Sequence, residues 1–398
     1  MKVLVINCGS SSLKYQLFNM ENEEVLAKGL VERIGIDGSR LEQKSGGEEH
    51  EVKTEIPNHD VAVQLVFDAL TNKEYGVIES LDEISAVGHR VVHGGESFTA
   101  STLIDEEVIA AIHANAPFSP LHNPANIQGI EACRKALGDK PMVAVFDTAF
   151  HQTMPAANYI YALPYELYKE DGIRRYGFHG TSHNFIANRA AELLEKPVEE
   201  LNIISCHLGN GSSITAIRGG KSYNTTMGLT PLAGVPMGTR TGDIDPAIVT
   251  FLQKQKNLSS EEVDNLLNKQ SGVLGISGKS SDFRDLEEGA AAGDERCQLA
   301  LDIFHARVRG VIGQYAVDMG GRIDAITFTG GIGENGAQNR AAICRGLDII
   351  GAVIDEEKNA VRKPKEKVIS TDDSQVKIMV IPTDEELMIA RDTQALAN

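Results

Sequence analysis

The sequence has few cysteines and no long apolar run. Its five cysteines are scattered, odd in number and form no C-x-x-C pair, so neither a disulfide framework nor a zinc cluster is indicated. The apolar run near the amino terminus spans only residues 3–6. A signal peptide needs roughly 7 to 15 apolar residues and a membrane span roughly 18. We therefore expect a protein of the reducing cytoplasm that has no membrane partner.

Basic residues are also scarce. The chain carries 38 Lys and Arg against 56 Asp and Glu, a formal net charge of -18. Such a surface repels nucleic-acid backbones and anionic membranes at long range, so nucleic acid is not an expected partner. If the ligand is itself an anion, basic residues in the site must overcome this field locally. Arg and Lys within glycine-rich segments are therefore the informative ones.

The length and apolar content indicate two or three folded domains. With 398 residues, 42% of them apolar, the chain has core material for units of roughly 100 to 200 residues each. Short apolar runs alternate with segments of helical spacing, which is typical of α/β architecture with buried central strands. The expected strands are residues 3–6, 142–146, 201–205, 324–328 and 376–381, and the expected helices are residues 106–116, 184–196 and 295–319. The polar segment 36–58 predicts an exposed hairpin or edge strands without chemistry.

A strand that leads into a turn of small residues occurs twice. Residues 7–12 (NCGSSS) follow the first strand, and residues 207–213 (HLGNGSS) follow another strand half a chain later. Each copy predicts a β-hairpin whose tip exposes backbone N–H groups and hydroxyls. The echo suggests two related domains, although turns of small residues between strands are common in unrelated proteins.

Both turns are candidate phosphate cradles. A phosphate needs convergent N–H groups, small residues that permit close approach, and one or two cations. The first turn offers Asn7, Ser10 and Ser12, with Lys14 as a point charge, and the second turn is similar but has no lysine. The alternative is a polar hairpin turn beside a surface lysine.

A third glycine cluster supports a competing function. Residues 329–336 (TGGIGENG) follow an expected strand and fit G-x-G-x-x-G, and Asp355 lies nineteen residues after Gly336. This is the dinucleotide fingerprint, so a nucleotide-binding oxidoreductase is an alternative, although the match lies late in the chain. A Walker A motif is absent, because Val273 stands where its first glycine should be.

Two arginines lie in glycine-rich segments without regular periodicity. Arg90 stands in GHRVVHGG and Arg240 in PMGTRTGDIDP, and an arginine in such a loop suits bidentate recognition of a carboxylate or phosphate. A structural ion pair with a nearby Asp is the alternative for each. The i, i+4 histidine pairs 89/93 and 179/183 contain or adjoin glycines and lack the Glu of H-E-x-x-H. They favour hydrogen bonding or substrate contact over zinc.

Acidic residues follow two of the expected strands. Asp147 comes directly after strand 142–146, at a carboxyl end, where ligand sites of α/β sheets gather. Residues 382–387 (PTDEEL) follow the last strand and open a helix, with Thr383 as the expected N-cap. A carboxylate there either complements the helix dipole or binds Mg²⁺.

Taken together, these segments resemble the acetate and propionate kinase family of the sugar kinase, Hsp70 and actin superfamily. The matching segments are NCGSSSLK, GHRVVHGG, PLHNPAN, VFDTAFH, RRYGFHGTSH, HLGNGSS, MGTRTGDIDP, TGGIGEN and IPTDEEL. Nine in the family's order leave little room for chance. The resemblance implies an α/β fold of two domains with duplicated ribonuclease H-like (actin-like ATPase) topology and an interdomain cleft. The implied domains are residues 1–147, joined by the C-terminal helix 385–398, and a nucleotide-binding domain of residues 148–384.

The resemblance also implies roles for individual residues. The catalytic residues would be Asp147, His179 and Arg240. The residues for the substrate carboxylate and its small acyl group would be Arg90, Val92, Leu121, His122, Phe178 and Pro231. The residues for the nucleotide would be Ser10, Ser12, Lys14, His207, Leu208, Gly209, Asn210, Gly211, Asp282, Phe283, Arg284, Gly330, Gly331, Ile332, Gly333 and Glu334. Mg²⁺, or Mn²⁺ in its place, would bind at Asn7 and Glu385; the preceding residue, Asp384, stands where the family frequently has Asn.

The implied reaction is the reversible, Mg²⁺-dependent transfer of the γ-phosphoryl group of ATP to acetate by direct in-line displacement. A carboxylate acceptor is already ionised at neutral pH because its pKa is about 4, so Asp147 is expected to organise other groups rather than accept a proton. Val92 takes more space than Ala would and favours acetate over propionate. Propionate kinase and a non-catalytic ATP-binding module remain alternatives. The resemblance further implies a homodimer.

Overall fold

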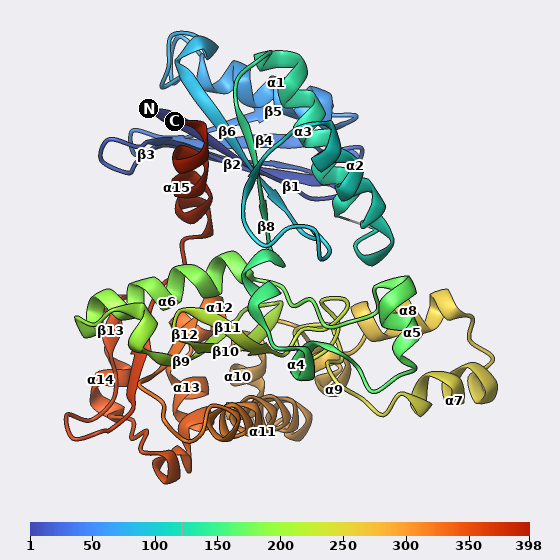
Figure 1. Cartoon of the computed structure of the whole chain (residues 1–398), viewed down its shortest axis with the longest axis vertical. Coiled ribbons are helices and arrows are strands. Elements are labelled where there is room, and N and C mark those ends of the chain that lie inside the picture. Colours follow the sequence, from blue (N-terminus) through green and yellow to red (C-terminus); the bar gives the residue numbers. More distant parts are fainter. Residues whose placement is uncertain (121) are drawn as a thin grey trace. The chain divides into compact units, whose positions relative to one another are not determined.

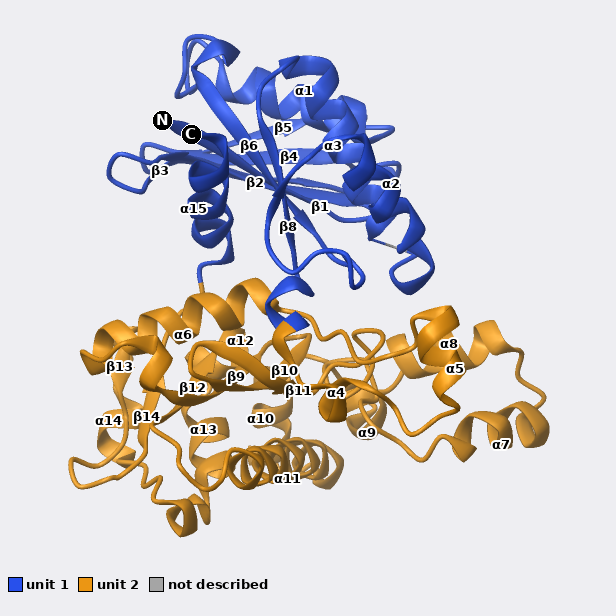
Figure 2. Cartoon of the chain, viewed as in Figure 1, with its two compact units in different colours: residues 1–152, 384–398 blue, residues 153–383 orange. Residues whose placement is uncertain are grey.

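The protein divides into two compact units (Figure 2). In the computed structural model, residues 1–120 and 122–398 are described. One unit contains residues 1–152 and 384–398, and the other contains residues 153–383. The first unit therefore ends at Gln152, within the 3₁₀ turn Ala149–Thr153 and beyond the implied boundary at Asp147. Leu121, expected in the acyl pocket, lies outside the described residues.

The first unit is built on a mixed sheet of order β5-β4-β3-β2-β1-β6-β8-β7 (Figure 1). Its strands are β1 (Lys2–Cys8), β2 (Ser12–Asn19), β3 (Glu24–Glu32), β4 (Arg40–Ser45), β5 (Glu48–Lys53), β6 (Ile84–Val91), β7 (Thr102–Leu103) and β8 (Met142–Phe146). Strands β1, β2 and β3 pair antiparallel, whereas β6 and β8 continue parallel to β1. The carboxyl ends of β1, β6 and β8 therefore lie at the same edge of the sheet.

Helices cover both faces of this sheet. They are α1 (His59–Leu70), α2 (Glu106–Ala114), α3 (Asn123–Leu137) and α15 (Glu385–Ala397). Alternate residues of β1 point to opposite faces: Leu4 and Ile6 belong to the apolar cluster that includes α1 and α3, whereas Val3 and Val5 pack with Ile389 of α15. The C-terminal helix is thus part of the first unit's core.

The second unit repeats the central topology of the first. Its sheet has the order β11-β10-β9-β12-β14-β13, with β9, β10 and β11 antiparallel and with β12 and β14 parallel to β9. The strands are β9 (Asn202–Leu208), β10 (Ser212–Arg218), β11 (Lys221–Thr225), β12 (Ala325–Thr329), β13 (Lys367–Val368) and β14 (Lys377–Val380). Three antiparallel strands followed by two parallel ones form the centre of both sheets, so the duplication predicted from the two hairpins is confirmed.

Helices flank the second sheet as well, with α6 and α11 on opposite sides of it in Figure 1. The helices of this unit are α4 (Ala156–Tyr159), α5 (Tyr165–Asp171), α6 (Gly180–Leu194), α7 (Ala247–Lys256), α8 (Ser260–Lys269), α9 (Gly272–Ser277), α10 (Phe283–Ala291), α11 (Glu295–Asp318), α12 (Gly330–Asn335), α13 (Ala337–Cys344) and α14 (Glu356–Ala360). Phe304, Val308 and Ile312 of α11 pack on Ile204 and Phe328 of the sheet. This helix carries the largest share of the unit's core.

The expected strands and helices are all present. The exposed hairpin predicted within residues 36–58 is formed by β4 and β5. One local expectation was wrong. The N-cap of α15 is Asp384, whose side chain accepts a hydrogen bond from the Leu387 N–H, and not Thr383. The hydroxyl of Thr383 lies instead 2.8 Å from Ser182 Oγ.

Candidate active site

In the first unit, three neighbouring strand ends bring Asn7, Arg90 and Asp147 together. Ile6 of β1 pairs with His89 of β6, and the Asp147 N–H donates to Val91 O at 3.0 Å. The three polar side chains therefore emerge side by side at the carboxyl edge of the sheet. This is the location at which open α/β sheets bind ligands.

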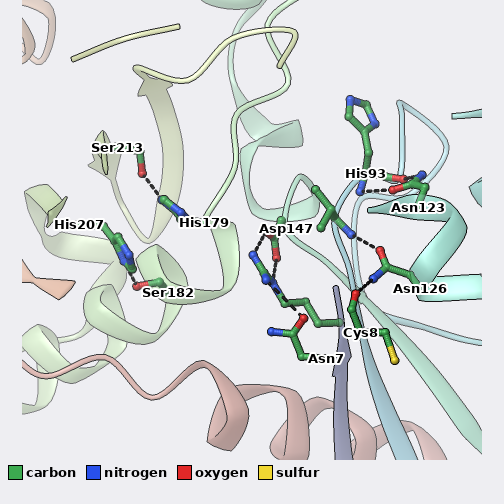
Figure 3. Close-up of polar contacts among 12 residues, drawn as sticks. Asn7, Cys8, His93, Asn123, Asn126, Asp147, His179, Ser182, His207 and Ser213 are labelled. Atoms are coloured by element: carbon green, nitrogen blue, oxygen red, sulfur yellow. Dashed lines mark hydrogen bonds and ion pairs between the residues drawn. The ribbon is translucent and has the colours of Figure 1, made fainter. Parts of the chain in front are cut away.

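Arg90 is the centre of this cluster, whose Asn7 and Asp147 are labelled in Figure 3. Its Nε donates to Asp147 Oδ1 at 2.9 Å and its Nη2 donates to Asp147 Oδ2 at 2.6 Å, while Nη1 lies 3.5 Å from Asn7 Oδ1. Burial works against the charged guanidinium, but the ion pair with Asp147 raises the pKa of Arg90 above its ordinary value. The structural ion pair considered for Arg90 therefore exists. This ion pair fixes the guanidinium group of Arg90 through Nε and Nη2.

Glu385, the first residue of α15, adds a second carboxylate to this cluster. Burial raises the pKa of Glu385 to about 7; Arg90 and Lys14 oppose the rise, while Asp147 and Glu386 add to it. Asp384 is engaged in capping its own helix, as described above. Of Asp384 and Glu385, it is therefore Glu385 whose pKa is affected by the charges of Arg90 and Asp147.

The segment after Arg90 is held by two buried asparagines of α3. Asn126 Oδ1 accepts from the Val92 N–H at 3.1 Å, and Asn123 Oδ1 accepts from the His93 N–H at 3.2 Å. Asn126 and Asn123 were not singled out from the sequence, although both lie in the PLHNPAN segment. His122 immediately precedes α3. The remaining described acyl-pocket candidates, Phe178 and Pro231, belong to the second unit.

The phosphate turn of the first unit is a tight hairpin between β1 and β2. The Gly9 N–H donates to Ser12 O at 2.8 Å, and His59 Nε2 lies 2.8 Å from Gly9 O. Ser10 and Lys14 are exposed, and Ser12 is half-buried. The tip therefore exposes Ser10 and Lys14, and phosphate binding at this turn stays a prediction.

In the second unit, the equivalent hairpin tip meets both His179 and Arg240. A Cβ placed on Gly211 would lie 3.5 Å from Nη1 and from Nη2 of Arg240, and 3.6 Å from His179 Cε1. The loop that carries Arg240 approaches the tip closely because Gly238 has no side chain: a Cβ there would lie 2.0 Å from Asn210 Oδ1. The structure thus brings three of the predicted residues, Gly211, His179 and Arg240, to one place.

Arg240 has no ion-pair partner in the described part of the chain. Its Nη1 donates to Pro231 O at 3.0 Å and lies 3.6 Å from Met237 Sδ, and burial lowers the pKa of Arg240. The structural ion pair considered for this residue is therefore absent. A partly buried cation without a counter-charge is costly, and an anionic ligand would supply that charge.

His179 is fixed by a chain of hydrogen bonds. Its Nδ1 lies 2.9 Å from Ser213 Oγ (Figure 3). The same hydroxyl lies 2.8 Å from His183 Nε2. His179 occupies the left-handed region, with φ of 56°, directly before α6 begins. The ring also stacks on His207 with centroids 4.2 Å apart. The i, i+4 pair His179/His183 thus has the hydrogen-bonding role that the glycines favour.

A hollow of about 620 Å³ adjoins this hairpin tip within the second unit. It is lined by Gly209, Asn210, Ser281, Asp282, Phe283, Arg284, Glu287, Gly331, Ile332, Asn335, Gly336 and Asn339. Seven of these belong to the predicted nucleotide set, and they come from three separate segments. The other five, Ser281, Glu287, Asn335, Gly336 and Asn339, were not in that set. Ser281, Asn335 and Gly336 adjoin predicted segments in the sequence, whereas Asn339 reaches the hollow through the tertiary fold, where its Nδ2 donates to Glu287 Oε1 at 2.7 Å.

Other members of the predicted nucleotide set support the loop instead of lining the hollow. Gly330 has φ of 76°, and a Cβ on it would lie 2.7 Å from Leu208 O. Arg340 donates to Gly333 O at 2.8 Å, and Glu334 Oε1 accepts from the Gly330 N–H at 3.0 Å. These residues hold the TGGIGENG loop tightly against the end of β9.

The sequence comparisons now decide the family. The family model of the acetokinase family matches residues 2–391. The chain belongs to the acetokinase family. It is 60% identical to the acetate kinase of Methanosarcina acetivorans over 397 residues, covering 100% of this chain and 97% of the relative. This assignment argues against the oxidoreductase alternative, and the G-x-G-x-x-G match forms helix α12 after β12 rather than a first βα unit.

Solved structures of this family share the fold. The acetate kinase of Porphyromonas gingivalis superimposes with a TM-score of 0.96 at 46% identity, covering 100% of both chains. A propionate kinase from Francisella tularensis gives a TM-score of 0.93 at 44% identity, covering 99% of both. The predicted fold class is confirmed. Among the described residues, no helix is both long and apolar enough to cross a bilayer.

Proposed function

We propose that this acetokinase-family protein transfers the γ-phosphoryl group of ATP to acetate, giving acetyl phosphate and ADP, and that the reaction runs in both directions. The observation that carries the proposal is the uncompensated guanidinium of Arg240 against Gly211 and His179. Phosphoryl transfer spreads negative charge over three equatorial oxygens, and neutralising that charge is most of the catalytic task. A cation without a partner beside a glycine-rich tip suits this task.

The reaction needs no general base. An acetate oxygen attacks the γ-phosphorus, the bond from that phosphorus to the bridging oxygen breaks, and the electron pair leaves with ADP. Since acetate, with a pKa of about 4, is ionised at neutral pH, no proton has to be removed from it. Asp147 therefore acts by holding Arg90 through its two hydrogen bonds.

Arg90 is proposed to bind the acid and Arg240 the phosphate. The Nε and Nη2 atoms of Arg90 are taken by Asp147, so Nη1, which lies near Asn7 Oδ1, is the atom we assign to the substrate carboxylate. Arg240 and His179 are assigned to the transferring phosphoryl group. The two hairpin tips and the hollow lined by Ile332 and Phe283 are assigned to ATP.

Mg²⁺ fits the oxygen-bearing residues of the first unit. Mg²⁺ takes oxygen ligands, commonly one or two carboxylates together with substrate phosphates, and Asn7 and Glu385 would supply an amide oxygen and a carboxylate. Burial raises the pKa of Glu385 although Arg90 and Lys14 oppose the rise, so a cation bound beside this carboxylate would favour its charged form. When bound, the cation would neutralise phosphate charge and help to align the transfer. Mn²⁺ has the same ligand preference.

Acetate is proposed as the preferred acid. Val92 is buried beside the Arg90 segment and leaves less room than Ala would for a third carbon. The 44% identity to the propionate kinase of Francisella tularensis favours propionate as the second candidate. We further propose a cytoplasmic homodimer.

The proposal is tested by trapping the acyl phosphate. The protein is incubated with ATP, Mg²⁺, hydroxylamine and either acetate or propionate, and the acyl hydroxamate is measured. We expect hydroxamate with both acids and a higher kcat/KM for acetate. An oxidoreductase or a non-catalytic ATP-binding module would yield none, and that result would refute the proposal.

A further inference from the structure

The parallel ladder between β1 and β6 ends at Ile6 and His89, yet the two strands are bridged again beyond that point by one side chain. Asn126, near the start of α3, accepts from the Val92 N–H at 3.1 Å through Oδ1 and donates to Cys8 O at 2.8 Å through Nδ2 (Figure 3). Its side chain is 2% exposed. The Asn126 amide therefore links the two strand ends beyond the point where their backbone pairing stops.

The two strand ends that Asn126 joins carry different parts of the site. Cys8 directly follows Asn7 and begins the turn that holds Ser10 and Ser12. Val92 lies two residues after Arg90 and is itself an acyl-pocket residue. The same amide thus holds the turn assigned to phosphate and the segment assigned to the acid.

The side-chain amide of Asn126 satisfies both backbone groups at this place. It offers an acceptor and donors in one plane, whereas a carboxylate only accepts and an aliphatic side chain does neither. Loss of either hydrogen bond leaves a buried backbone group unpaired and frees one strand end to move. A displacement of about 1 Å between reacting groups can cost about 100-fold in rate.

We propose that Asn126 is a positioning residue that fixes the separation between the phosphate turn and the acyl pocket, and thereby sets both the transfer rate and the choice of acid. The proposal rests on the proposed function. Asn123 supports the same segment from one side: its Nδ2 donates to the carbonyls of His93 and Ile112, both at 3.0 Å. It does not contact Cys8 and therefore cannot take over the bridge.

The test compares Asn126→Ala with a matched loss elsewhere in the same unit. Gln43 is 0% exposed; its Oε1 accepts from the Tyr15 hydroxyl at 2.6 Å and its Nε2 donates to Ala69 O at 3.3 Å. Gln43→Ala therefore also removes two buried hydrogen bonds of a side-chain amide. Both variants are expected to lower the melting temperature, so kinetics are measured on protein that circular dichroism shows to be folded.

For Asn126→Ala we expect kcat with acetate to fall about 10-fold or more, and the acetate-to-propionate ratio of kcat/KM to change by about threefold or more. Gln43→Ala should keep both quantities near those of the wild-type protein. Asn126→Asp, assayed at pH 8, keeps the acceptor for Val92 but loses the donor to Cys8. It should lose kcat while preserving the ratio, and it remains informative if the alanine variant does not fold.

The outcomes separate this role from the proposed function. Absence of acyl phosphate with the wild-type protein overturns the proposed function and the role of Asn126 with it. An active wild-type protein with kinetically normal Asn126 variants overturns the positioning role alone, as do equal kinetic losses in Asn126→Ala and Gln43→Ala. Equal losses would mean that any buried amide of this unit matters in the same way.

Discussion

Arg240 is the residue whose surroundings are least explained by folding alone, because the described chain provides it with no carboxylate. We expect Arg240→Lys to lower kcat about 100-fold, since an ammonium cannot reproduce the planar fork and one preorganised donor is typically worth this much. Hydroxamate formation under saturating substrates measures the effect. Arg189→Lys is the control, because Arg189 pairs with Glu366 on the surface of the same unit. Near-normal activity of Arg240→Lys would contradict its assigned role.

Asp147 is 1% exposed and bonds Arg90 twice. Asp147→Asn keeps the shape but loses the charge and one acceptor, so the Arg90 fork is no longer held. We expect kcat to fall far more than the affinity for acetate, because misorientation is costliest in the transition state. Steady-state titration with acetate separates the two quantities. A raised KM with an unchanged kcat would show that Asp147 contributes only to binding.

Glu385 should make stability depend on pH. Because its pKa is raised to about 7 in the folded protein, from about 4.3 in an unfolded chain, the folded state favours the neutral carboxyl. Its contribution to stability is therefore full below about pH 4 and is lost as the pH rises through 7. In metal-free buffer, Glu385→Gln should raise the melting temperature at pH 8 by a few degrees, each 1 kcal/mol being worth about 2–4 °C. At pH 4 the two proteins should melt alike; an equal gain at both pH values would contradict the titration of this group.

Much of the candidate site could be predicted because its residues lie in short sequence segments that are recognisable without knowledge of the fold. Anion sites are predicted before any fold is known by arginines within glycine-rich segments, an aspartate after a buried strand and small residues in turns. Asn126 and Asn339 could not be found in this way. Their partners Cys8 and His305 lie 118 and 34 residues away in sequence, and only the tertiary fold brings them within hydrogen-bond distance.

At the scale of elements, the glycines of the two hairpin tips leave the space that we assign to phosphate oxygens. Gly211→Ala would place a methyl group 3.5 Å from the terminal nitrogens of Arg240, an ordinary contact that leaves the fold intact but fills the space assigned to phosphate oxygens. We expect kcat/KM for ATP to fall about 100-fold, because the methyl group would displace the phosphate and a displacement of about 1 Å can cost this much, with an unchanged melting temperature. Gly313→Ala on α11, where a Cβ meets nothing within 4 Å, is the control. An unimpaired Gly211→Ala would place the phosphate elsewhere.

Element boundaries show where local signals fail. The expected helix 184–196 begins earlier, at Gly180, directly after the left-handed backbone of His179. The start could not be predicted, because no side chain makes an N-cap hydrogen bond there. Thr383 has the right chemistry for an N-cap, yet its hydroxyl meets Ser182 and Asp384 takes the cap. In both places a tertiary partner or a backbone conformation overrides the propensity of the residue.

At the scale of the whole molecule, the chain builds two similar sheets but closes the first only with its last residues. The duplication was visible in the sequence because both copies retain the strand, turn and strand order. Only the family resemblance predicted that α15 packs on the first unit, because the apolar pattern of an amphipathic helix does not indicate which sheet the helix covers. Its apolar residues fit either unit equally well as a pattern.

Deletion of residues 384–398 should therefore unfold the first unit and spare the second. Ile389 and Ala390 are at most 1% exposed and cover Val3, Val5, Val143 and Val145, so the deletion opens one face of the sheet. Each large apolar side chain uncovered costs about 1.5–3 kcal/mol, against a domain stability of about 5–15 kcal/mol. Hydrogen exchange should show protection lost in β1, β6 and β8 but kept in β9 and β12. Arg391→Ala, which removes the surface pair with Glu23 but leaves α15 in place, should keep both units protected. A first unit that stays protected without α15 would show that the helix is dispensable for its core.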